Sequence, residues 1–447
     1  MKRTTFLLPI ICSLALSVVF GRAAGARRAT GLFAPSLHAG CLPLQPHTPM
    51  TQQGSAYGGL SAAIPAADSS FRTLSQDKPI DIKAIMAVVK QHLRNSLAAH
   101  KYPFRYPRSV NADGSIISVE SRDWTSGYYP GNLWQMYEYT RDGKWLSAAQ
   151  KWNIGLEKEK KSTHTHDLGL MLYCSYGHGY RLIQDENYKD ILLEGAQSLS
   201  TRFNEKTGCL RSWDHGKWEF PVIIDNMMNL ELLFRATQLS GDSTFHRIAV
   251  SHANTTIKNH FREDNSSYHV VDYDTATGTP KSKVTHQGYS DASAWSRGQA
   301  WGLYGYAMAY RFTKEKRYLE QAEKIADFYL SHPNLPADKV PYWDFDAPGI
   351  PNEPRDASAA AIAASGLLEL SMFSKERARY FGAAEDMLRS LGSPEYLATP
   401  GTNHDFVLKH SVGHKTANRE IDVPIVFADY YFIEALMRYE RIVKLED

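Results

Sequence analysis

Two kinds of helical pattern alternate along the chain from about residue 80 onward. In the first kind, a short polar turn is followed by an aromatic residue that opens a segment with one apolar stripe. In one such segment, Ala322, Ile325 and Tyr329 fall on the same side of a helix and charged residues occupy the other side. The opening aromatic residues are Trp145, Tyr188, Phe245, Tyr318 and Tyr380. Together with a helix near Ile80–Leu97, they predict six outer helices that each keep one face in water.

The segments just before these turns have apolar or small residues on nearly every side, and a helix without a polar face is buried all round. Glycines such as Gly298, Gly302 and Gly305 would let neighbouring helices approach closely. The six segments are residues 131–140, 167–183, 225–239, 297–312, 356–373 and 422–439. Helix pairs that cannot bury their apolar faces alone must stack. Six pairs that close on themselves predict an all-α (α/α)6 toroid, a single domain over residues 77–447 with the apolar helices as its inner wall.

The lengths of the connections indicate which rim of this toroid carries function. The turns from an inner to an outer helix are a few residues long, whereas four connections from an outer to an inner helix are long for a compact domain. They are residues 204–224, 262–296, 332–355 and 392–421. Because long loops are disproportionately functional, we expect the chemistry at the rim where the inner helices begin.

The N-terminal segment has the pattern of a targeting signal. In residues 1–26, two basic residues precede the apolar run Phe6 to Phe20 and small residues follow, which is the order of a secretory signal peptide. Residues 27–76 are rich in Ala, Gly, Pro and Ser and predict a poorly ordered leader. Cys41 follows a sequence that faintly resembles a lipoprotein cleavage site, but it lies far from the apolar run. We therefore expect an exported, periplasmic protein, with lipidation as the alternative and no membrane span.

Composition excludes several classes of function. The 447 residues include 50 Lys and Arg against 48 Asp and Glu, so the chain lacks the basic excess of a nucleic-acid-binding protein. Without Cys12, which lies in the signal, three cysteines remain, too few for a disulfide framework, and no Cys-x-x-Cys pair indicates zinc. Aromatic residues make up 12% of the chain, which suits a protein that stacks against rings.

Two aspartates open predicted inner helices and are the first candidates for chemistry. Asp167 follows His166, and Asp225 follows the apolar run 220–224. One interpretation is that both are helix N-caps, where Asp is favoured. The other is a pair of carboxyl groups facing a pocket, as in glycoside hydrolysis. A helix N-terminus stabilises the charged carboxylate, whereas apolar neighbours raise the pKa. Asp225 has the more apolar neighbours and is therefore the predicted proton donor.

Several motifs, in order and with compatible spacing, resemble a known family. They are His166-Asp167-Leu-Gly, Asp225-Asn-Met-Met-Asn, Gln287-Gly-Tyr-Ser-Asp and Ser296-Arg297-Gly-Gln-Ala-Trp301. From Asp123 to Arg438 the chain resembles the unsaturated glucuronyl hydrolases, family 88 of the glycoside hydrolases. The resemblance implies the six-hairpin toroid, and removal of the 4,5-unsaturated uronic acid that polysaccharide lyases leave at the non-reducing end of oligosaccharides. It implies neither a metal nor another cofactor.

The resemblance also assigns roles to the two aspartates. Asp225 would protonate C4 of the unsaturated sugar, and the resulting carboxylate would activate a water that adds at C5. The hemiketal formed in this way rearranges and expels the rest of the oligosaccharide. One carboxyl that acts first as acid and then as base needs a pKa near the working pH. Asp167 would stay ionised and hold ring hydroxyls.

The resemblance places further residues in the substrate pocket. They are Trp124, Trp213, His166, His269, Gln287, Arg297 and Trp301. Trp124 and Trp213 would stack on sugar rings, and the planar fork of Arg297 suits a carboxylate. Three of them have a purely structural interpretation as the alternative: Trp301 as inner-helix core, His166 as a neighbour of a cap and His269 as a structural loop residue. The histidines at 164, 166 and 286 lack the spacing of metal ligands, so no metal site is expected.

The identity of the oligosaccharide depends on the last long loop. Related enzymes that accept sulfated sugars carry serine and lysine there, which points to Ser411 and Lys415 as sulfate contacts, with a solvated basic loop as the alternative. Glycosaminoglycan fragments from heparan sulfate or chondroitin are the expected substrates, with fragments of other uronic acid polymers as the alternative. The rival functions are an unsaturated rhamnogalacturonyl hydrolase, an α/α-toroid polysaccharide lyase and a glycan-binding protein without activity. The expected oligomeric state is a monomer or homodimer.

Overall fold

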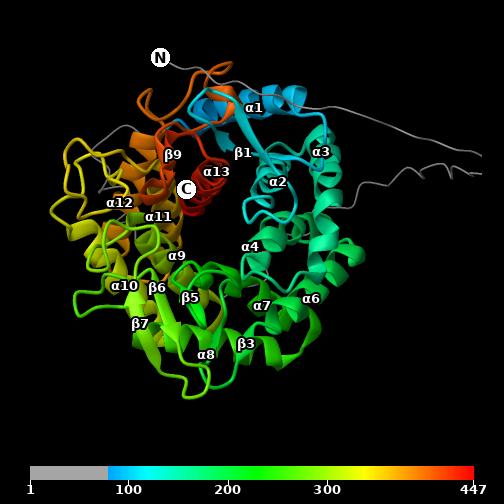
Figure 1. The fold of residues 1–447 in the computed structure, drawn as a ribbon. Coiled ribbons are helices and arrows are strands. Elements are labelled where there is room, and N and C mark those ends of the chain that lie inside the picture. Colours follow the sequence, from blue (N-terminus) through cyan, green and yellow to red (C-terminus); the bar gives the residue numbers. More distant parts are fainter. Residues whose placement is uncertain (1–78, 447) are drawn as a thin grey trace, which may run out of the picture. The chain divides into compact units, whose positions relative to one another are not determined.

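Inner and outer helices alternate along residues 79–446, the part of the chain that the computed structural model describes (Figure 1). The outer helices are α1 (Ile82–Ala99), α3 (Gly143–Asn153), α6 (Glu186–Ser200), α8 (Ser243–Asn259), α10 (Lys316–Ser331) and α12 (Arg377–Leu391). The inner helices are α2 (Tyr128–Thr140), α4 (Leu168–Leu172), α7 (Asn226–Ser240), α9 (Ser296–Thr313), α11 (Ala357–Ser371) and α13 (Val426–Glu446). The second inner helix continues from α4 through one π-helical turn (Tyr173–Gly177) into α5 (His178–Ile183). This arrangement confirms the predicted (α/α)6 toroid.

The inner helices pack against one another in sequence order, and contacts between α13 and α2 close the ring. Every residue of α11 is buried, as its lack of a polar face predicts. Glycine allows the closest approaches: a Cβ on Gly305 of α9 would lie 2.5 Å from Met227 Cβ of α7. Outer helices bury one stripe only, which in α10 includes Tyr318, Ala322 and Ile325.

The short turns between inner and outer helices have a common local construction. An inner helix ends at a residue in the left-handed conformation, at Arg141, Gln184, Gly241 or Lys314. In the first three turns the next residue is an aspartate whose carboxylate accepts a backbone N–H of the following outer helix at 2.8–2.9 Å. A left-handed residue followed by an N-cap reverses the chain within two residues, so these turns stay short.

Several connections from an outer to an inner helix carry short antiparallel strands that the helical pattern did not predict. They are β1 (Tyr106–Val110) with β2 (Ile116–Val119), β3 (Phe203–Asn204) with β4 (Cys209–Leu210), β5 (Pro221–Ile223) with β6 (Val270–Tyr273) and β7 (Pro280–Val284), and β8 (Ser411–His414) with β9 (Arg419–Val423). The last inner helix was predicted to begin at Asp422 and instead begins at Val426. Asp422 has φ 56° and lies in β9, and Pro424 disfavours helical backbone at the residue before it.

None of the helices within residues 79–446 is long and apolar enough to span a bilayer. The described residues all fall within the compact unit 56–447. The predicted signal peptide, leader and Cys41 lie outside the described residues. Cys174 and Cys209 are buried free thiols.

Candidate active site

Asp167 and Asp225 occupy N-cap positions of α4 and α7, but neither carboxylate caps its helix. Their backbones are helical, with φ −63°, ψ −10° at Asp167 and φ −56°, ψ −26° at Asp225. A capping side chain needs extended backbone, as at Asp142 with ψ 120°. Neither carboxylate is therefore occupied by its own helix, and both are available to contact other groups. Each side chain keeps about a fifth of its surface exposed, 20% for Asp167 and 18% for Asp225.

Close packing of α4 on α7 brings the two aspartates together. Gly169 makes this possible, because a Cβ there would lie 2.5 Å from the Asn229 carbonyl oxygen. The Asn229 side chain joins the helices: its Oδ1 accepts the Leu170 N–H at 2.8 Å, and its Nδ2 lies 3.4 Å from His166 Nδ1. The sequence analysis did not assign Asn229, although it lies four residues after Asp225 in the same motif.

The surroundings of Asp225 hold its carboxyl near the midpoint of titration at neutral pH. Burial, with a smaller contribution from the charge of Asp167, raises the pKa of Asp225 to about 7, against opposing effects of Arg297, the backbone and Trp301. The Trp301 indole N–H is close enough to Asp225 to lower its pKa as a donor, although the contact falls short of full hydrogen-bond geometry. Asp225 Oδ2 is buried and without a hydrogen-bond partner in the described chain.

His269 faces Asp225 because of a strand register. Ile223 pairs with Val270 in the β5–β6 ladder, and the Ile224 N–H donates to the His269 carbonyl at 3.1 Å. This places His269 Nε2 3.6 Å from Asp225 Oδ2. His269 Nδ1 accepts the backbone N–H groups of His286 and Gln287 at 3.2 and 3.0 Å. Burial holds the pKa of His269 well below its usual value. The neutral ring therefore carries its proton on Nε2, directed at Asp225.

His166 stands in the same relation to Asp167. Asn229 donates toward its Nδ1, so the ring proton belongs on Nε2, which lies 3.4 Å from Asp167 Oδ1. Burial lowers the pKa of His166, so this ring is neutral as well. Thr165, which the sequence analysis did not assign, donates to Asp167 Oδ2 at 2.8 Å. Two buried, neutral histidines thus each point an N–H at one aspartate.

Arg297 differs from the expected carboxylate partner. Its side chain is buried, with Nη1 donating to Asp356 Oδ2 at 2.8 Å and to the Val412 carbonyl, and Nη2 donating to the Gly413 carbonyl at 2.6 Å. The fork is occupied by α11 and β8 and is not open for bidentate contact with a sugar acid. Its contribution to the reacting centre in this structure is its positive charge, which lowers the pKa of Asp225.

The aromatic candidates and Gln287 lie in different surroundings. Trp301 is 1% exposed within α9, so it belongs to the inner wall. Trp124 is half-buried against Phe427, with ring centroids 5.0 Å apart. Trp213 is half-buried, pairs through its backbone with Thr165, and lies 5.6 Å from the His286 ring. Gln287 contributes its backbone N–H to His269.

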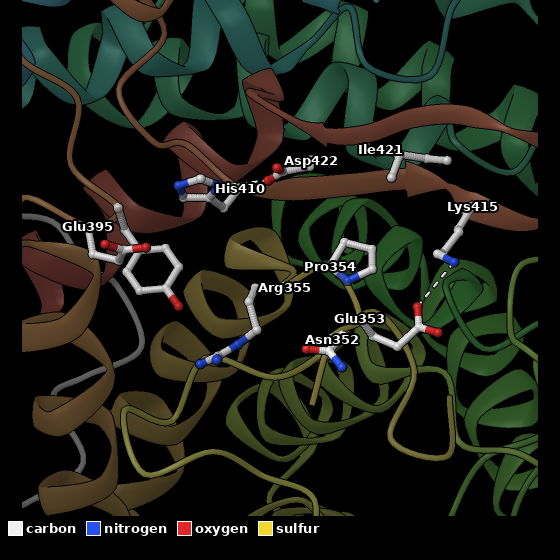
Figure 2. A pocket seen from close by; sticks show the side chains of 10 residues that line it. Asn352, Glu353, Pro354, Arg355, Glu395, His410, Lys415, Ile421 and Asp422 are labelled. Carbon is white, nitrogen blue, oxygen red and sulfur yellow. Dashed lines mark hydrogen bonds and ion pairs between the residues drawn. The ribbon is translucent and has the colours of Figure 1, made fainter. Parts of the chain in front are cut away.

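Ser411 and Lys415 do not form an anion site together. The Ser411 hydroxyl is buried and has no hydrogen-bond partner among the described residues, and Lys415 Nζ lies 3.1 Å from Glu353 Oε2. Figure 2 shows this ion pair at the edge of a cavity of about 510 Å³, in which His410 lies beside Asp422. The predicted sulfate contact thus lacks an accessible serine and a free ammonium group.

The site as a whole suits proton transfer to and from a small neutral group. It offers one carboxyl with a pKa near 7, a second carboxyl beside it, and two fixed N–H donors. Within residues 79–446, no group of three or more His, Cys, Asp or Glu side chains could hold a metal ion.

Comparison with known proteins identifies relatives of the whole toroid. Residues 99–345 match Glycosyl Hydrolase Family 88. An unsaturated glucuronyl hydrolase of Formosa agariphila is 49% identical over 342 residues, 76% of this chain and 85% of that protein. An unsaturated chondroitin disaccharide hydrolase of Streptococcus pneumoniae is 34% identical, over 80% of this chain and 91% of that protein. The crystal structure of an unsaturated glucuronyl hydrolase specific for heparin superposes with a TM-score of 0.80 at 50% identity, covering 81% of this chain and 98% of that chain.

Proposed function

The chain belongs to glycosyl hydrolase family 88, and on that premise we propose that it removes a 4,5-unsaturated glucuronic acid from the non-reducing end of lyase-generated oligosaccharides. The observation that carries the mechanism is Asp225, a carboxyl that does not cap its helix, has a pKa of about 7, and has an unpartnered oxygen. A general acid that later serves as base works best with a pKa close to the operating pH.

The reaction begins with the protonated form of Asp225. Its proton passes to C4 of the sugar, the electrons of the C4–C5 double bond form the new C–H bond, and the ring oxygen stabilises the positive charge at C5. Asp225, now ionised, accepts a proton from a water molecule whose oxygen adds to C5. The hemiketal opens by breaking the bond between C5 and the ring oxygen. The hemiacetal left at C1 then releases the remaining oligosaccharide.

The two histidine–aspartate contacts support these steps differently. The His269 N–H points at the Asp225 oxygen that becomes charged after proton transfer. Because Nδ1 accepts two backbone N–H groups, the ring proton stays on Nε2 and can stabilise that charge. Asp167 accepts from Thr165 and faces the His166 N–H, so its orientation is fixed while its exposed surface remains open to sugar hydroxyls.

Glycosaminoglycan fragments are the proposed substrates. Support comes from the names of the relatives, one of which is specific for heparin and another of which acts on an unsaturated chondroitin disaccharide. Export to the periplasm, through the signal-like residues 1–26, places the enzyme where such fragments would arrive. Cell fractionation with mass spectrometry of the mature N-terminus tests the export and the alternative of lipidation at Cys41, and gel filtration with light scattering decides between monomer and homodimer.

The decisive experiment follows loss of the ultraviolet absorbance of the conjugated uronate. Unsaturated disaccharides from heparin, chondroitin and hyaluronan digests are offered to the wild type, Asp225→Asn, Asp167→Asn and the control Asp242→Asn. We expect Asp225→Asn to bind substrate and lose about 10²- to 10⁴-fold in kcat, the range of general acid–base contributions. Asp167→Asn should lose about 100-fold through lost orientation.

Asp242 is a matched control because it is a true N-cap, of α8, and asparagine caps as well as aspartate. Its variant should keep wild-type turnover. Full turnover by Asp225→Asn would overturn the proposed mechanism. Binding without turnover by the wild type would favour a glycan-binding protein, and an absorbance increase with intact polymer would favour a lyase.

A further inference from the structure

Three histidine side chains that no step of the reaction uses form a cluster beside Trp213: two of them contact Trp213, and the third contacts one of those two. His215 stacks on Trp213 with ring centroids 5.5 Å apart and an interplanar angle of 23°. His286 lies 5.6 Å from Trp213, and its ring lies 4.8 Å from that of His414. They come from three separate connections, so only the folded chain assembles them. We call His215, His286 and His414 the rim histidines.

The rim histidines and Trp213 neighbour groups that contact the two aspartates. The His286 ring is 6.1 Å from that of His269, which faces Asp225. Trp213 pairs with Thr165, which donates to Asp167. A sugar joined to the reacting uronate would therefore meet Trp213 and these rings. His215 and His286 are exposed, in contrast to the buried His269.

The ring nitrogens are available to a ligand. Among the described residues, no hydrogen-bond partner contacts the ring nitrogens of His215 or His286. His414 Nε2 lies 3.0 Å from the His286 carbonyl, which only accepts, so Nε2 is the donor and Nδ1 remains open. Each ring can thus offer at least one nitrogen without breaking an existing bond.

The charges around these rings favour an anion. Arg297 and Arg419 face His414, while Glu420 beside it is held by Arg108 at 2.7 Å. Partial burial of its ring and repulsion by His414 and His215 together lower the pKa of His286 to about 4. Burial likewise lowers the pKa of His414.

A bound anion would change the protonation of the rim histidines. A proton on His286 is opposed by His414 beside it, and the pKa of each of these two rings is lowered. A negative group among the rings would remove that repulsion and draw a proton in.

We propose that the rim histidines and the Trp213 face form an anion subsite that binds a sulfate ester on the sugar attached to the unsaturated uronate. This inference rests on the proposed function and names its substrate class more narrowly. It also replaces Ser411 and Lys415 as the sulfate contact. Because the sulfate stays ionised at all working pH values, its binding is coupled to proton uptake by His286 and His414, whose pKa values are lowered in its absence.

The test compares two disaccharides that differ only by one sulfate ester on the amino sugar. Each is assayed by absorbance loss between about pH 5.5 and 7.5, and kcat/KM for the sulfated substrate is divided by that for the unsulfated one. Titration of Asp225 affects both substrates equally and cancels in this ratio. We expect the ratio to rise about three- to tenfold as the pH falls across this range, because uptake of a fraction of one proton accompanies sulfate binding. O6- and N-sulfated disaccharides are both tested.

Glutamine variants remove protonation while keeping a donor. His414→Gln can still donate to the His286 carbonyl, and the double variant H215Q/H286Q leaves the backbone of residue 286 in place. Both should flatten the pH dependence of the ratio through KM and leave turnover of the unsulfated disaccharide nearly unchanged. His410→Gln is the control, since His410 lies on the same segment but pairs with Asp422. A flat ratio in the wild type for every sulfated disaccharide, or a wild-type slope in both variants, would refute the subsite. Failure to consume either disaccharide would instead refute the proposed function.

Discussion

Replacing Gly169 by alanine tests whether helix packing positions the two aspartates. The new Cβ would lie 2.5 Å from the Asn229 carbonyl oxygen and 2.7 Å from the Asn229 Cα, both of them backbone atoms that cannot rotate away. Real Cβ contacts are rarely below about 3.4 Å, so α4 and α7 must separate by close to 1 Å. Overpacking of this kind costs about 1–3 kcal/mol. A displacement of about 1 Å at a reacting centre costs about 100-fold in rate.

The control for this variant is Gly382→Ala. Gly382 lies in the outer helix α12, and a Cβ there would meet no atom within 4 Å. Alanine in an open helical position stabilises by about 0.4–1 kcal/mol. Thermal unfolding and kcat on an unsaturated disaccharide are measured for both variants. We expect Gly169→Ala to lower both the melting temperature and kcat. Gly382→Ala should raise the melting temperature and leave kcat unchanged. Wild-type kcat in a folded Gly169→Ala protein would show that this contact does not position the aspartates.

Two further predictions concern charge. The free enzyme must hold Asp225 protonated, and the raised pKa of this carboxyl is about 7. For an unsulfated disaccharide, log(kcat/KM) should therefore fall with a slope approaching −1 above about pH 7. A value of kcat/KM that stays unchanged up to about pH 9 would contradict the role of Asp225 as acid. Arg311 of α9 lies 2.5 Å from both Glu231 of α7 and Glu369 of α11. Arg311→Met should lower the free energy of unfolding by about 3–5 kcal/mol in urea titrations, because it leaves the buried Glu231 carboxylate unpaired while Glu369 keeps its ion pair with Arg438. An unchanged urea midpoint would show that the ion pairs contribute no net stability.

The chemistry of this site depends on backbone groups that fix side-chain protonation. Two backbone N–H groups at residues 286 and 287 decide which His269 nitrogen carries the proton, and the Leu170 N–H orients the Asn229 amide that decides it for His166. Such contacts cost little once the loops are folded, and they leave each aspartate facing a donor. Among the described residues, the ring nitrogens of His215 and His286 have no contacts of this kind, so they remain available to a ligand.

The helices and their alternation could be predicted from the sequence because helical periodicity is local. Apolar residues on all sides of α11 require burial, and one stripe in α10 requires a single buried face, whatever the rest of the chain does. The same local reasoning placed Asp167 and Asp225 at the start of inner helices and identified apolar neighbours that would raise the pKa of Asp225. It also predicted that the long connections would hold the remaining chemistry.

Only the tertiary structure decided which distant groups meet those aspartates. The pairing of Ile223 with Val270 brings His269 to Asp225, and no local pattern specifies this register across a long loop. The distance between the rings of His286 and His414 depends on two connections that lie far apart in the chain, and Arg297 turned out to be bonded to α11 and β8. Periodicity reports which faces of an element are buried; the partners that each face receives, and hence the pKa of a buried carboxyl, follow from packing between segments that are remote in sequence.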